Sequence, residues 1–248
     1  MRRRWFLTAM MTPPLLAQPR RAAGADPPGS AVPIPDDFTF IVEKLEAVRA
    51  AVDRRALTLM TIVGPMTASS AAKDPSLTYP AVLASRLKAA WPDVRVQSGL
   101  LPIARMEAAL FQASLAAGLS QKTPNLVIWG VGGTAAARGD DLASFHIQLA
   151  DAIATTRSAG ADMILMTPQY APVVARLMNL PPYRDAVLKE AQEAAVPVLD
   201  RYELMRYWSD NGILDLDAQT QTAQISVAHT ANTWIARLLA DGIVKAVA

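Results

Sequence analysis

Residues 56–64 read ALTLMTIVG, a run of apolar and β-branched residues that ends at a glycine. A continuous apolar run of this length predicts a strand buried on both faces, as in a parallel sheet. Pro65, Met66 and the hydroxyl-rich segment TASS at 67–70 come directly after it. Because the loops at the carboxyl ends of parallel strands gather the functional groups of α/β proteins, this segment is a natural place for a site.

Four more apolar runs alternate with helical patterns along the chain. The expected strands are 56–63, 94–97, 125–130, 162–167 and 196–199. The expected helices are 37–53, 79–91, 103–118, 139–159, 182–195, 201–210 and 226–246. This alternation predicts an α/β fold, a three-layer α/β/α sandwich with a five-stranded parallel sheet of the flavodoxin-like kind. The site is then expected in the loops after Val63, Gln97, Trp129 and Thr167, and at the start of the last helix.

The first 25 residues have the pattern of an export signal. A basic start, MRRRWFL, overlaps an apolar run of 13 residues, and AAGA supplies an A-x-A cleavage pattern. This run is short of the roughly 20 residues that a membrane span needs. Arg3 to Leu7 resemble the twin-arginine signature, and an ordinary Arg-rich secretory signal is the alternative. Residues 26–36 are rich in proline and predict a linker to a single domain at 37–248, located in the periplasm or secreted.

The composition excludes several classes of site. The chain has no cysteine, and its only histidines are His146 and His229, so thiol chemistry and a multi-histidine metal site are excluded. We expect no cofactor and no metal. Without residues 1–25 the count of Lys and Arg falls from 24 to 19 while all 22 acidic residues remain, which changes the net charge from +2 to −3. No dense basic stripe is left, so we do not expect nucleic acid as a partner.

The order and spacing of these pieces resemble the SGNH, or GDSL-type, esterase and lipase family. Gly64 ends the first strand, and Tyr79-Pro80 opens the next helix, as in that family. The later matching pieces are VRVQSGLLPIAR (94–105), LVIWGVGGTAAARGD (126–140), ILMTPQYAPVV (164–174) and the stretch from VPVLDRYELM (196–205) to the last helix. The resemblance covers about 55–248 and implies the SGNH hydrolase fold.

The resemblance also implies a serine nucleophile, two oxyanion donors and an Asp-x-x-His block, and this chain departs from each. The nucleophile position falls on Met66, whose thioether cannot form an acyl-enzyme. One oxyanion donor falls on or beside Pro102, which has no N–H, and the asparagine donor falls on Thr134. The Asp and His positions fall on Ala223 and Ser226. We therefore expect no catalytic residue at these positions.

Other side chains remain candidates for the cleft. Thr67, Ser69 and Ser70 follow the first strand, although hydroxyls at such places also cap helices and turns. A shift of the last block by three residues would bring His229 to the base position, with Ser226 instead of an orienting Asp. The candidate cleft residues are thus Thr67, Ser69, Thr134, Ser226 and His229.

Two functions of different classes follow from these residues. The first is an exported, catalytically inactive protein that binds a cell-envelope ligand or a protein partner through the former active-site cleft; an acylated polysaccharide is one such ligand. The second is an active esterase or polysaccharide O-acetylesterase that uses His229 as base with Thr67, Ser69 or Ser226 as the hydroxyl. A scaffold subunit of the envelope, with an unused cleft, is a third reading.

Overall fold

The computed structural model describes residues 31–65, 67, 73–103 and 108–248. Five parallel strands form one sheet in the order β2-β1-β3-β4-β5. The strands are β1 (Ala56–Val63), β2 (Arg95–Pro102), β3 (Leu126–Gly130), β4 (Asp162–Met166) and β5 (Val198–Leu199). The helices are α1 (Glu46–Asp53), η1 (Pro75–Leu77), α3 (Tyr79–Ala90), α4 (Ala108–Lys122), α5 (Gly133–Arg138), α6 (Leu142–Ser158), α7 (Pro172–Leu177), α8 (Pro181–Glu193), α9 (Arg201–Asp210) and α10 (Gln221–Val247).

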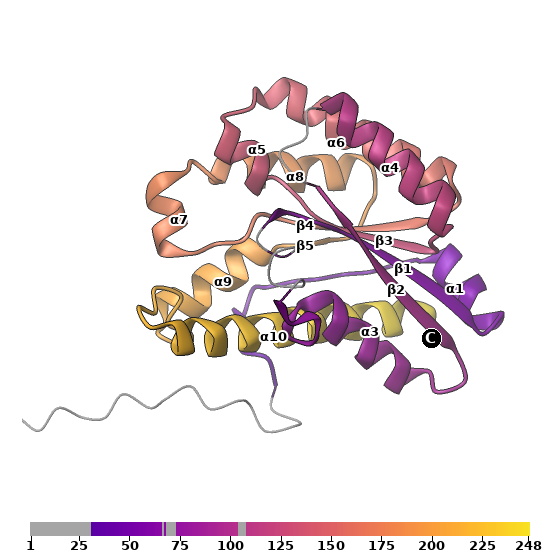
Figure 1. Cartoon of the computed structure of the whole chain (residues 1–248), viewed down its shortest axis with the longest axis horizontal. Helices are drawn as coiled ribbons and strands as arrows, with labels where there is room; N and C mark the ends of the chain where they lie inside the picture. The colour runs from indigo at the N-terminus through magenta and orange to yellow at the C-terminus, as the bar shows by residue number, and fades with distance from the viewer. Residues whose placement is uncertain (1–30, 66, 68–72, 104–107) are drawn as a thin grey trace, which may run out of the picture.

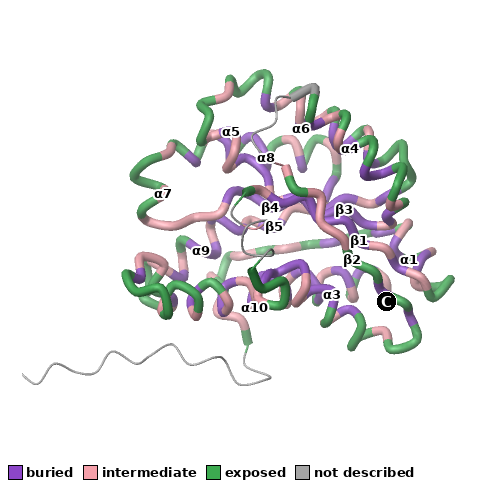
Figure 2. Tube along the Cα trace, in the orientation of Figure 1, coloured by how far each residue is buried: buried purple, intermediate pink, exposed green. Residues whose placement is uncertain are grey.

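Helices cover both faces of this sheet, so the predicted three-layer α/β/α sandwich is confirmed (Figure 1). Helices α4, α6 and α8 pack on one face, and α1, α3, α9 and α10 pack on the other. Alternation along β1 explains the two layers, because Leu57 and Leu59 belong to one core cluster while Met60 and Ile62 belong to the other. Figure 2 shows the buried residues concentrated along the central strands.

Most predicted elements agree with the structure, and the differences have local causes. Strand β1 spans the predicted 56–63, but β2 runs to Pro102 instead of ending at Gln97, so the expected loop after Gln97 was wrong. Proline is tolerated there because β2 is an edge strand. The short helices α5 and α7 were not predicted, and α10 begins at Gln221, five residues before the predicted start.

The first predicted helix, 37–53, was wrong over its first half. Helix α1 begins at Glu46, and over residues 37–43 exposed residues alternate with half-buried or buried ones at the period of an extended chain. Val42 and Leu45 join the core, and Phe40 crosses α10 so closely that a Cβ on Gly242 would lie 2.6 Å from its ring. The Trp208 indole N–H donates to the Pro33 carbonyl over 2.6 Å. Residues 31–45 thus form an amino-terminal strap along the domain.

Candidate functional site

A cavity of about 270 Å³ lies at the carboxyl edge of the sheet. The loop after β4 contributes Gln169 and Tyr170, α9 contributes Arg201 and Met205, and the connection from α9 to α10 contributes Asp215. Thr67 and Thr78 line it from the segments between β1 and α3. The cavity therefore forms where the topology of a parallel sheet gathers its loops, and its volume approaches the range of small-molecule sites.

Helix α10 forms one wall of this cavity. Val227, Ala228, Ala231 and Ile235 line it at the spacing of a single helical face. The two alanines leave room that larger side chains would fill. The Asn232 side-chain amide donates to the Leu77 carbonyl over 2.9 Å, which ties α10 to η1 beside the cavity.

Arg201 is the most deeply buried charge at this edge. It is the first residue of α9, directly after the helix cap Asp200, and only 8% of its surface is exposed. Its Nε donates to the Thr167 carbonyl over 3.3 Å. A Cβ on Gly130 would lie 3.3 Å from its Nη2 and 3.5 Å from its Nη1, so the missing side chain at the end of β3 makes room for the guanidinium.

No carboxylate neutralises Arg201 within the part of the chain that the structure describes. It forms no ion pair there, and its sole hydrogen bond there is the one to Thr167. Burial lowers the pKa of Arg201, and the nearby Tyr79 offsets only part of this effect. Burial also raises the pKa of Tyr79 to about 12, so this phenol is neutral at physiological pH. An unpaired charge in such a place costs several kcal/mol of desolvation.

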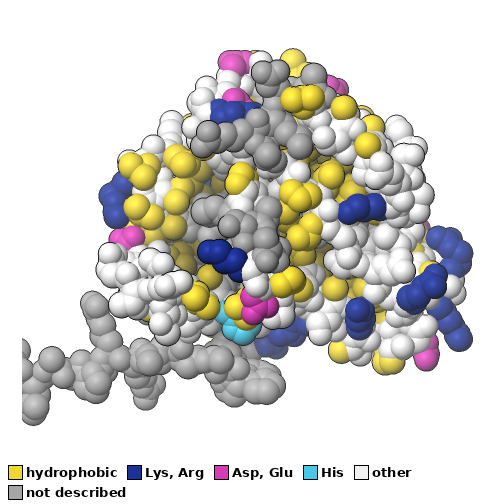
Figure 3. All heavy atoms as spheres, in the orientation of Figure 1, with side chains coloured by type: hydrophobic (Ala, Val, Ile, Leu, Met, Phe, Trp, Pro, Cys, Tyr) yellow, Lys and Arg dark blue, Asp and Glu magenta, His cyan; other side chains and the backbone are white. Residues whose placement is uncertain are grey.

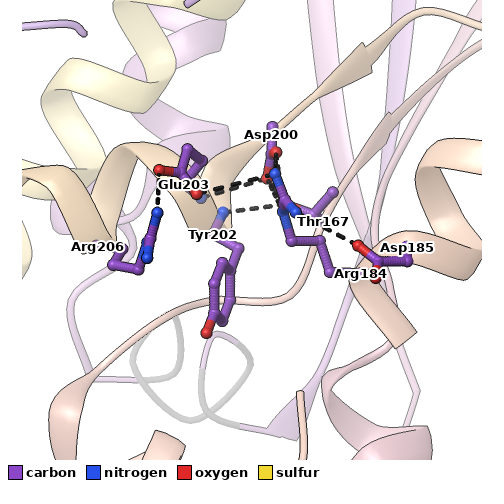
Figure 4. Close-up of polar contacts among 7 residues, drawn as sticks. All are labelled: Thr167, Arg184, Asp185, Asp200, Tyr202, Glu203 and Arg206. Atoms are coloured by element: carbon purple, nitrogen blue, oxygen red, sulfur yellow. Dashed lines mark hydrogen bonds and ion pairs between the residues drawn. The ribbon is translucent and has the colours of Figure 1, made fainter. Parts of the chain in front are cut away.

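Figure 4 shows a polar cluster around Asp200, the residue before Arg201. Its charges are paired, and we call it the compensated cluster; its members are Thr167, Arg184, Asp200, Tyr202 and Glu203. The Asp200 carboxylate accepts from Arg184 Nε over 2.9 Å, from the Thr167 hydroxyl over 2.8 Å and from the Glu203 amide. Thr167 is fully buried and also accepts from the Tyr202 amide over 2.9 Å. Burial lowers the pKa of Arg184, but the hydrogen bonds and charge of Asp200 outweigh it and raise that pKa. This network fixes the start of α9 and so the position of Arg201.

A second, smaller cavity of about 40 Å³ lies on the other face of the sheet edge. Thr134, Trp129 and Phe111 line it, and the two aromatic rings stack with centroids 4.8 Å apart. The Thr134 hydroxyl oxygen would lie 3.7 Å from a Cβ on Gly64, so the loops after β1 and β3 meet here. Gly132 has a φ of +94° and packs against Pro168, a conformation that favours glycine. This volume holds about one water molecule and no larger ligand.

The residues singled out in the sequence fall in different places. Thr67 lines the larger cavity and Thr134 the smaller one, whereas Ser226 and His229 of α10 line neither. Pro102 is exposed at the end of β2, opposite Val63 of β1. Met66, Ser69 and Ser70 lie outside the described residues. His146 is placed on α6 as expected, with Nδ1 3.5 Å from a Glu190 oxygen.

The residue that sequence reasoning missed is Arg201. The expected site loops included those after four strands but not the one after β5, where Asp200 and Arg201 lie. An adjacent Asp and Arg directly after an apolar strand is the signal that pointed there. The sequence does not show that Asp200 pairs with Arg184 and that Arg201 is left without an ion pair in the described chain.

The described residues contain neither a metal-binding cluster nor a membrane-spanning helix. No three His, Asp or Glu side chains among them gather closely enough to hold a metal ion. None of the helices in the described ranges is both long and apolar enough to cross a membrane.

Solved structures with the same fold include several esterases. TesA matches with 20% identity and a TM-score of 0.54 over 72% of this chain and 97% of its own. The lipase/acylhydrolase from Enterococcus faecalis matches with 17% identity and a TM-score of 0.56 over 76% of this chain and 96% of its own. A two-domain esterase active on acetylated mannans matches with 15% identity and a TM-score of 0.60 over 81% of this chain and 54% of its own. At these identities the likeness shows the SGNH hydrolase fold.

A comparison with curated protein sequences finds no significant match. The sequence model of one family, described as the Non-GDSL lipase-like family, matches residues 31–248. This range includes the amino-terminal strap and every strand of the sheet. The chain therefore belongs to the Non-GDSL lipase-like family.

Proposed function

We propose that this protein is an exported, non-hydrolytic member of its family that binds a cell-envelope ligand in the 270 Å³ cavity. The observation that carries the proposal is the lining of that cavity, which among the described residues contains neither a serine nor a histidine. Acyl transfer through a hydroxyl needs a base within hydrogen-bond reach of the nucleophile. The cavity is lined instead by a buried arginine, amide side chains and an apolar helix face.

An acylated polysaccharide is the ligand class that we favour. Two structures with this fold are described as acting on such polymers or their fragments, the esterase active on acetylated mannans and an acetyl-xylooligosaccharide esterase. Helix α7 begins directly after Ala171 of the cavity, and its Val173 and Leu177 are exposed, 46% and 77%. Figure 3 shows hydrophobic side chains gathered over α7. An apolar surface beside a polar cavity suits a sugar polymer that carries acyl groups.

Export would bring the protein to the compartment that contains the proposed cell-envelope ligand. The basic, apolar and A-x-A segments of residues 1–25 support a signal that directs the chain to the periplasm or the outside, through either the twin-arginine or the general route. Processing after Ala25 would leave a domain with a net charge of −3.

Hydrolysis assays test the proposal directly. We expect no release of p-nitrophenol from p-nitrophenyl acetate, and no acetate from acetylated xylan, above the rate in buffer. In affinity electrophoresis, we expect acetylated xylan to retard the protein more than the same polymer after deacetylation. A protein retarded equally by both polymers does not recognise the acyl groups.

The esterase alternative makes the opposite prediction. Thr67 and Asp215 line the same cavity, and His229 is the base that the sequence offers. Turnover that Thr67→Ala or His229→Ala abolishes, and that the exposed control Thr222→Ala leaves unchanged, would replace our proposal with this alternative.

A further inference from the structure

The unneutralised Arg201 points to the chemistry of the ligand. An arginine stays charged in proteins, so burial does not relieve it by loss of its proton. Its surface is 92% buried, yet within the described chain it forms no ion pair, its one hydrogen bond is to the Thr167 carbonyl, and the nearby ionisable side chain is the neutral Tyr79. Buried charges in proteins are as a rule paired. Because Arg201 lines the cavity, the cavity is where a partner can reach it.

The rest of the lining limits the charge and the shape of that partner. Asp215 lines the same cavity and would repel a group with two negative charges more strongly than a group with one. A carboxylate carries one charge and matches the planar fork of a guanidinium in a bidentate pair. Gln169, Asn232 and Asp215 supply amide and carboxylate groups that suit hydroxyls.

We infer that Arg201 binds the carboxylate of a singly charged, hydroxyl-rich ligand, and that the cavity takes a uronic acid unit of an envelope polysaccharide. This inference rests on the proposed function and names its ligand more narrowly. In the bound state the carboxylate oxygens accept from the Arg201 guanidinium. Tyr170 and the alanines of α10 line the cavity that would hold the sugar ring, and Gln169 and Asp215 are the groups available to its hydroxyls.

The test is a titration of the full-length protein followed by NMR, with the arginine Nε–H resonances included. D-glucuronate and D-galacturonate are compared with D-glucose and D-galactose, which have the same rings without the carboxylate, and with inorganic phosphate. We expect at least one uronate to bind about tenfold or more tightly than its neutral sugar, and to shift the Arg201 Nε–H resonance. Neutral sugars that bind as tightly as the uronates would overturn the inference, and so would phosphate that binds more tightly than either uronate.

Substitutions assign the effect to one side chain. Arg201→Met keeps the length of the side chain and is expected to weaken uronate binding about ten- to a hundredfold. Arg201→Lys keeps the charge but not the fork, so we expect only partial recovery. The matched control is Arg206→Gln on the same helix, whose partner is Glu203 and which does not line the cavity. Unchanged uronate binding in folded Arg201→Met would contradict the inference; if that variant does not fold, the wild-type titration and the Arg201 resonance decide.

This inference and the proposed function fail separately. Ester hydrolysis together with Arg201-dependent uronate binding would leave the carboxylate site standing and remove the non-hydrolytic role. No hydrolysis together with no preference for uronates would leave that role standing and remove the carboxylate site.

Discussion

Arg184 contacts Asp200 and Arg201 follows it in the chain, yet the two arginines differ in whether their charge is paired. Arg184 comes from α8, keeps 25% of its side chain exposed and pairs with Asp200. Arg201 follows Asp200 in the chain, is more deeply buried, and forms no ion pair within the described ranges. The Asp200 carboxylate therefore pairs with Arg184, the more exposed of the two arginines, and not with the buried Arg201.

The difference separates a structural charge from a binding charge. Asp200 also caps α9 and accepts from Thr167, so its bonds to Arg184 belong to the packing of α8, α9 and β4. Arg201 forms one hydrogen bond in the described chain, so it stabilises the fold little against the desolvation cost of its burial. A protein that holds a cation in this state is organised in advance for an anion that arrives later.

Removing the Asp200 carboxylate should give the largest loss of stability. Asp200→Ala leaves Arg184 without its partner, uncaps α9 and removes the acceptor of Thr167, so we expect the free energy of unfolding to fall by about 3 kcal/mol. Urea denaturation measures it. The control is Asp185→Ala, because Asp185 also contacts Arg184 but is 68% exposed, and its loss should cost under about 0.5 kcal/mol. Equal costs for the two variants would show that the compensated cluster is not structural.

Thr167→Val should have the next largest effect. The substitution keeps the shape but removes the hydroxyl that joins Asp200 to the Tyr202 amide, and it leaves that buried amide without its acceptor. We expect a loss of about 2 kcal/mol in urea denaturation. Thr222→Val, at an exposed position of α10, should change the value by less than about 0.5 kcal/mol. A cost no larger than that of the control would mean that the hydroxyl does not hold β4 to α9.

The two arginines should respond with opposite signs when each is replaced by methionine. Arg184→Met breaks a pair and lowers the free energy of unfolding, whereas Arg201→Met removes an unpaired buried charge and raises it by about 1 kcal/mol in ligand-free protein. Thermal and urea denaturation at neutral pH measure both. A loss of stability in Arg201→Met would show that this arginine supports the fold. The distinction between a structural Arg184 and a binding Arg201 would then be wrong.

Gly130→Ala should have the smallest effect on stability. The new Cβ presses on the Arg201 guanidinium, while loss of a glycine from a strand favours folding by about 0.5–1 kcal/mol, so the two effects nearly cancel. Uronate binding, followed by NMR, should weaken several-fold because the guanidinium is displaced. Gly133→Ala, whose Cβ would meet no atom within 4 Å, is the control. In the Arg201→Met background Gly130→Ala should stabilise the protein; no such gain would mean that the two positions do not contact.

The layered fold could be predicted from the sequence because its signal is local. The run at 56–63 is apolar along its whole length, and β1 spans the same residues. The helix predicted from Asp37 failed because Phe38, Phe40 and Val42 fit a helical spacing loosely and an extended spacing well, and only packing on α10 decides between them.

The candidate site was less accessible to sequence reasoning. Thr67 follows a strong strand signal and does line the larger cavity. Arg201 follows β5, a strand of two residues, and its importance lies in the absence of a partner among the described residues. Pairing depends on distances between α8, α9 and β4, segments that are far apart in the sequence. No local pattern encodes which arginine Asp200 selects.

The amino-terminal strap sets a limit on any proteolytic processing that accompanies the proposed export. Cleavage at the predicted Ala23-x-Ala25 pattern leaves the whole strap on the mature protein. A cut beyond Pro33 would strip the indole of Trp208 of its acceptor, and a cut beyond Phe40 would open a furrow over Gly242. If the chain is processed as proposed, a signal peptidase that cuts at Ala25 would leave every contact of the strap in place.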